Sequence, residues 1–71
     1  MSIPVVAPMA GIVISIDVKP GDKVNQNDVV ATIEAMKMYV KIFAPVDGEV
    51  KEINVGQDDV VNPDTVVMVL E

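Results

Sequence analysis

The apolar residues of the chain fall in short runs dominated by valine and isoleucine, and proline and glycine separate these runs. Side chains branched at Cβ favour strands over helices, whereas proline and glycine mark turns. The pattern therefore predicts an all-β chain without helices. Strands are expected over residues 3–6, 11–18, 28–35, 38–44, 48–55 and 65–70, with short extended pieces around Val24 and Val61.

The sequence also repeats itself. A shift of 37 positions, which lays Ala44 over Ala7, aligns residues 7–34 with residues 44–71 without a gap, and 12 of the 28 pairs are identical. These pairs are Ala7/Ala44, Pro8/Pro45, Gly11/Gly48, Val13/Val50, Ile16/Ile53, Val18/Val55, Asp22/Asp59, Val24/Val61, Asn25/Asn62, Val29/Val66, Val30/Val67 and Glu34/Glu71.

The identical pairs are turn residues and inward-facing apolar residues in the same order, so the two halves should follow the same path. Neither half is large enough to bury an apolar face alone, so the halves should pack on one another about a pseudo-twofold axis. This arrangement predicts a flattened barrel or sandwich of two sheets. It also places the join between the halves, residues 35–43, at the opposite end from the chain termini.

The alternation of apolar and polar residues changes phase within this join. Apolar residues occupy odd positions from 31 to 35 and even positions from 38 to 42, which is typical of a hairpin closed by two residues. The expected inward pairs are Ala35/Met38, Ile33/Val40 and Ala31/Ile42, and the expected outward pairs are Glu34/Tyr39 and Thr32/Lys41. Met36 and Lys37 then form the tip.

Methionine and lysine are unusual residues for such a turn. A two-residue hairpin loop usually needs positive φ, which favours asparagine, aspartate or glycine and costs other residues about 1 kcal/mol or more each. Lys37 could be an ordinary solvated lysine, and Met38 is expected to fill the core, unlike Met36. A long amine at the most protruding point of a rigid β-domain instead fits a site that another protein reaches and modifies.

Composition excludes several classes of function. The chain has no cysteine or histidine, which excludes a disulfide framework, a Cys/His zinc site and catalysis by thiolate or imidazole. Eleven acids against five lysines, with a net charge of −6, argue against binding to nucleic acid. Asp58 and Asp59 are expected in a solvated turn. No apolar run could span a bilayer and no signal-like segment is evident, so a cytoplasmic protein is expected.

The motif "EAMKM" at residues 34–38 resembles the biotin attachment motif, and "APMAG" (7–11) and "APVDGEV" (44–50) resemble the turn segments that flank it. From Val5 to Glu71 the chain is similar to the biotinyl domain, the biotin carboxyl carrier domain of biotin-dependent carboxylases and decarboxylases. The resemblance implies one carrier domain over residues 1–71, with half-repeats 7–34 and 44–71, folded as a flattened barrel of two four-stranded antiparallel sheets.

The resemblance also implies the chemistry. Lys37 would carry covalent biotin, attached by biotin protein ligase, and Glu34, Ala35, Met36 and Met38 would form the part of the hairpin that the ligase recognises. The biotin would carry CO2, as carboxybiotin, from a biotin carboxylase to a carboxyltransferase or decarboxylase, with no catalysis by the carrier itself. The isolated domain is expected to be a monomer that does not insert into membranes.

Two departures from the family pattern refine this expectation. Ala10 replaces the second proline of a common Pro-Met-Pro-Gly turn, and no insertion separates residues 11–18 from Pro20, so the chain resembles the carriers that lack a protruding thumb. Two other interpretations remain: a lipoyl carrier, which usually has Asp before the lysine and Ala after it, and an unmodified interaction module. The substrate of the parent enzyme, and whether the chain is a free subunit, stay open.

Overall fold

The computed structural model describes all residues, 1–71, and contains eight strands and no helix. The strands are β1 (Ile3–Val6), β2 (Gly11–Ile16), β3 (Lys23–Val24), β4 (Val29–Ala35), β5 (Met38–Phe43), β6 (Gly48–Ile53), β7 (Val60–Val61) and β8 (Val66–Leu70). The prediction of an all-β chain is confirmed, although several strands end one or two residues inside the predicted bounds.

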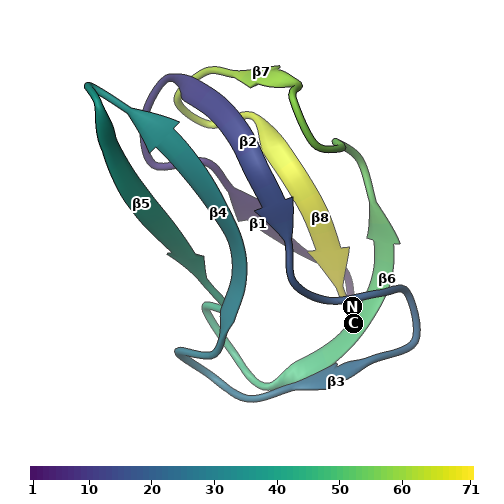
Figure 1. Ribbon diagram of the computed structural model, residues 1–71. Coiled ribbons are helices and arrows are strands. Elements are labelled where there is room, and N and C mark those ends of the chain that lie inside the picture. The colour runs from purple at the N-terminus through teal and green to yellow at the C-terminus, as the bar shows by residue number, and fades with distance from the viewer.

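The strands form two four-stranded sheets, in the orders β1-β8-β6-β3 and β5-β4-β2-β7, and every pairing is antiparallel. The sheets face each other across the core of an elongated molecule of 32 × 18 × 18 Å (Figure 1). The core consists of 15 buried residues, all of them apolar, and Ile33, Met68 and Leu70 are its largest fully buried side chains. This is the predicted flattened barrel of two sheets.

The internal repeat is visible in the topology. Strands β2, β3 and β4 of one half correspond to β6, β7 and β8 of the other, and β5 corresponds to β1, so the two sheet orders are equivalent. The strand irregularities correspond too. Val30 and Val67 are the extra residues of equivalent bulges, as are Ile14 and Lys51. A bulge bends a strand and increases its twist, so both sheets curve around the core in the same way.

The turns repeat at the level of backbone conformation. Gly21 and Asp58 occupy equivalent positions with φ of 93° and 74°, and Asn27 and Asp64 do so with φ of 74° and 70°. The turns are also closed by equivalent side chains. The Asp22 carboxylate accepts a hydrogen bond from the backbone N–H of Lys19 (2.9 Å), and Asp59 accepts one from Gly56 (2.8 Å). Asp58 and Asp59 therefore lie in an exposed turn, as predicted, and the carboxylate of Asp59 stabilises its shape.

The two ends of the molecule differ in how they are closed. Strands β1 and β8 bring the chain termini side by side, with Ile3 paired to Leu70. The equivalent strands β4 and β5 are joined by a tight turn, which lies at the far side of the molecule from the termini (Figure 1). The join between the halves is thus a protruding hairpin.

Candidate functional site

The hairpin between β4 and β5 is closed by two residues. Ala35 pairs with Met38, which leaves Met36 and Lys37 as the loop. Their φ values are 52° and 64°, and positive φ at both central residues defines a type I′ turn, whose twist matches that of the flanking strands. The predicted register is confirmed through all five pairs from Ala35/Met38 to Ala31/Ile42.

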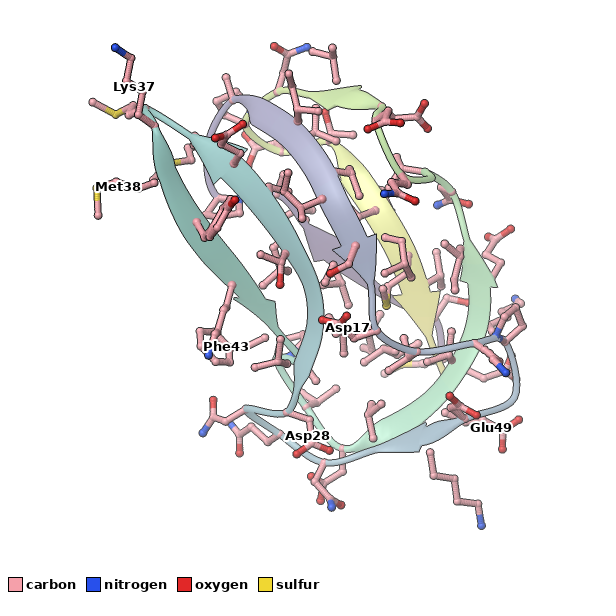
Figure 2. The ribbon with its side chains drawn as sticks, viewed as in Figure 1. Asp17, Asp28, Lys37, Met38, Phe43 and Glu49 are labelled. Atoms are coloured by element: carbon pink, nitrogen blue, oxygen red, sulfur yellow. The ribbon has the colours of Figure 1, made fainter.

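Lys37 is exposed, and its side chain projects from the tip away from both sheets (Figure 2). None of the side-chain hydrogen bonds of the protein involves it. Met36 beside it is 88% exposed. The tip therefore presents an exposed primary amine with no side-chain hydrogen bond that would have to be broken before another protein could bind it.

The support beneath the tip is rigid. Ala35, Ile33 and Ile42 are buried with 4%, 0% and 4% of their surface exposed, so the hairpin is anchored in the core close to its turn. Strand β2 also approaches β4 closely, because a Cβ atom added at Gly11 would lie 2.5 Å from the carbonyl oxygen of Glu34. The hairpin thus carries the exposed side chain of Lys37 on a backbone that is anchored in the core.

The prediction that Met38 fills the core is wrong. Its side chain points away from the body of the molecule (Figure 2) and is 66% exposed, although its partner Ala35 is buried. The alternation predicted its pairing with Ala35 correctly, but not its burial. Strand β5 is an edge strand and Met38 is its first residue, so no neighbouring strand or opposing sheet covers it. Both methionines of the motif are therefore available for contact with a partner.

Glu34 and Tyr39 are paired and exposed, as the alternation predicted. The structure adds two residues to this side of the hairpin, because Glu34 pairs with Ile12 of β2, and Ile12 pairs with Val60 of β7. Sequence reasoning missed Ile12 and Val60. The internal repeat could have revealed them, because apolar Ile12 aligns with charged Glu49 and apolar Val60 aligns with charged Lys23.

No group of acidic side chains is arranged to hold a metal ion, and the surface contains no pocket. The structure has no helix that could cross a membrane.

Comparison with known proteins identifies the family and the fold. Residues 3–70 match the Biotin_lipoyl family, described as "Biotin-requiring enzyme". Over 41 residues, which are 58% of this chain, the sequence is 54% identical to the glutaconyl-CoA decarboxylase subunit gamma of Acidaminococcus fermentans. The chain spans 28% of the length of that subunit.

Two solved structures are similar over nearly the whole chain. The urea carboxylase of Kluyveromyces lactis matches with a TM-score of 0.94 and 27% identity, covering 100% of this chain and 6% of that one. A single-chain, multi-domain long-chain acyl-CoA carboxylase matches with a TM-score of 0.90, covering 96% of this chain and 7% of the carboxylase chain. Because the sequence identity is 24%, this second likeness shows the fold alone. Given the match over residues 3–70, the chain belongs to the Biotin_lipoyl family.

Proposed function

We propose that the chain is a biotin carboxyl carrier domain, extending over residues 1–71, and that biotin is attached to Lys37. The observation that carries the proposal is the position of this one lysine, at the tip of a strained type I′ turn between two exposed methionines. The 54% identity to a subunit of glutaconyl-CoA decarboxylase and the likeness to urea carboxylase support a role in biotin-dependent carboxylation or decarboxylation.

The residues at the tip fit the cofactor. An amide bond would form between Nζ of Lys37 and the carboxyl carbon of activated biotin, while Nζ loses a proton and the activating group departs. This bond needs an amine that is accessible from outside the domain, and the exposed Lys37 meets that requirement. When bound, biotin supplies the transfer of CO2, which no side chain of this domain can perform.

The protein residues present and tether the group. Burial of Ile33, Ala35 and Ile42 anchors the base of the hairpin in the core, while the side chain of Lys37 at its tip is exposed. A tethered group reaches a high effective concentration near partner sites that lie within its span. We infer that the partners are biotin protein ligase, a biotin carboxylase, and a carboxyltransferase or decarboxylase.

The turn sequence supports biotin over lipoate as the cofactor. The family includes lipoyl domains by name, so a lipoyl arm on the same lysine is the second candidate. Met36 and Met38 favour biotin, because lipoyl carriers usually have Asp before the lysine and Ala after it. Both methionines are exposed on either side of Lys37, which supports contact between them and an attaching enzyme.

Intact mass spectrometry tests the proposal. The purified chain is incubated in parallel with a biotin protein ligase, biotin and ATP, and with a lipoate ligase, lipoate and ATP. The expected result is the mass of one biotin added in the first reaction and no change in the second. A lipoyl adduct alone would establish the second candidate. If neither reaction gave an adduct while control domains were labelled, the proposal would be wrong, and an unmodified interaction module would be the remaining interpretation.

A further inference from the structure

One row of exposed side chains crosses the whole outer face of the sheet that carries Lys37. The row follows the strand register from Tyr39 on β5 through Glu34 on β4 and Ile12 on β2 to Val60 on β7. Tyr39 and Val60 are each 72% exposed and Ile12 is 43% exposed. We call these four residues the tip row. Residues paired across strands share a face, so the row is continuous and begins two residues from Lys37.

The internal repeat provides a control for this row. The equivalents of Val60, Ile12 and Glu34 are Lys23, Glu49 and Glu71, which pair in the same way on the other sheet and are all exposed. We call these three residues the far row. Figure 2 shows Glu49 at the opposite end of the molecule from Lys37. The same fold thus accepts charged residues at positions where the tip row exposes apolar ones.

Other exposed apolar residues do not show this difference. Phe43 aligns with Val6 and Met9 aligns with Val46, and all four are apolar and partly exposed. Those positions are apolar in both halves and so reflect the shared fold. Ile12 and Val60 are adjacent and apolar although the fold does not require it, and exposed apolar side chains of this kind are typical of an interaction site.

Charge indicates the kind of partner. A second copy of the chain would bring together two molecules of net charge −6, with a glutamate inside each row. Exposed Asp58 and Asp59 precede Val60 and add negative charge to its end of the row. The complementary surface is therefore an apolar patch flanked by cationic side chains. Because the row adjoins the tip, the partner that covers it would also reach Lys37.

We propose that the tip row is a docking surface for the enzyme that acylates Lys37, and that recognition extends beyond the hairpin to Ile12 on β2 and Val60 on β7. The inference rests on the proposed function. It implies that the enzyme recognises the folded sheet, since Ile12, Glu34 and Val60 come together only through strand pairing.

The test exchanges residues between the two rows. The double variant Ile12→Glu with Val60→Lys introduces the residues of the far row and leaves the net charge unchanged. The matched control, Lys23→Val with Glu49→Ile, makes the reciprocal exchange on the other sheet. The rate of biotin incorporation is measured with a purified biotin protein ligase over a range of domain concentrations. Thermal melts establish that the variants fold.

We expect kcat/KM for the double variant to fall at least tenfold, mainly through KM, while the reciprocal variant matches the wild type. Should the double variant fail to fold, the single variants Ile12→Thr and Val60→Thr retain branched side chains and should each show a smaller rise in KM. Equal kcat/KM for the wild type and every folded tip-row variant would overturn the inference. No biotin on the wild type would overturn the proposed function with it.

A competition assay measures docking without the chemical step. The Lys37→Ala domain cannot accept biotin but should inhibit biotinylation of the wild type, and inhibition should be lost when Ile12→Glu and Val60→Lys are added to it. Inhibition should also weaken as salt concentration rises, because the flanking charges are exposed and screened. Equal inhibition with and without the tip-row changes would contradict docking on this face.

Discussion

The β4–β5 hairpin and the β8–β1 pair occupy equivalent places in the two halves, yet only the first is closed by a turn. The halves share their bulges, their turn hydrogen bonds and the positive φ of Gly21/Asp58 and Asn27/Asp64. Met36 and Lys37 are the remaining non-glycine residues with positive φ, and they have no equivalent. The bulges and turns that both halves share serve the fold, whereas the Met36–Lys37 turn, which has no equivalent, carries the candidate site.

The outer faces of the two sheets extend this comparison. Glu34 and Glu71 are identical at equivalent positions, so the comparison gives no reason to assign Glu34 alone a special role. Ile12 and Val60 differ from Glu49 and Lys23 in character at the same positions. In a duplicated fold, such differences separate residues required by packing from residues selected for contact with a partner.

Removing the amine at the tip should have the largest effect. Lys37→Ala should reduce biotin incorporation below detection, because no other lysine occupies a comparable turn. It should change the free energy of unfolding by less than about 0.5 kcal/mol, since the side chain is exposed. Streptavidin capture and a thermal melt measure the two effects. Lys23→Ala removes an exposed lysine on the other sheet and should behave like the wild type in both measurements. A large loss of stability in Lys37→Ala would indicate a structural role.

Moving the amine by one position should have the next largest effect. In the double variant Met36→Lys with Lys37→Met, the same turn carries an exposed amine aimed in a different direction. Biotin incorporation should fall roughly 100-fold, because nucleophilic attack tolerates little misplacement. Time courses at equal concentration with one ligase provide the measurement. If the rates were equal, any accessible lysine on this turn would suffice.

The close approach of β2 to β4 should make one glycine more sensitive than its equivalent. A Cβ added at Gly11 would lie 2.5 Å from the carbonyl oxygen of Glu34, whereas one added at Gly48 would lie 3.1 Å from that of Glu71. Gly11→Ala should therefore destabilise the protein by about 2–3 kcal/mol and Gly48→Ala by about 1 kcal/mol, as expected for overpacking. Urea denaturation compares them. The reverse order would contradict the tighter packing beneath the hairpin.

Relieving the strain of the turn should change stability less than Gly11→Ala does, and in the opposite direction. Asparagine tolerates the left-handed conformation better than methionine, so Met36→Asn should stabilise the protein by about 0.5–1 kcal/mol while slowing biotin incorporation. Met9→Asn, at a position without positive φ, should give no such gain. Melting temperatures and incorporation rates of both variants provide the comparison. A less stable Met36→Asn would show that the methionine itself supports the turn.

Much of the fold could be predicted because residues 7–34 and 44–71 carry the same pattern of turn and core residues. The repeat of turn residues and buried valines fixed the pairing of the halves, and the change of phase between Ala35 and Met38 fixed the register of the hairpin. The bulges at Val30 and Val67 could not be predicted, since each adds a buried apolar residue to a run that is already apolar.

The exposure of the site was harder to predict than its register. Alternation tells which side of a sheet a residue faces, but only the position of β5 at the sheet edge shows that Met38 is uncovered. The tip row depends on pairing between strands far apart in sequence, so Ile12 and Val60 come together only in the folded chain. The roles of Glu34, Ala35, Met36 and Met38 in ligase recognition stay predictions.

Peptide mapping of the wild-type chain tests the central claim most directly. The folded domain is incubated with biotin protein ligase, biotin and ATP, digested, and each of its five lysines is scored for biotin by mass spectrometry. The proposed function predicts biotin on Lys37 and on none of Lys19, Lys23, Lys41 and Lys51. Biotin on any of those four in the folded domain, or an unmodified Lys37 under conditions that label a control carrier, would contradict it.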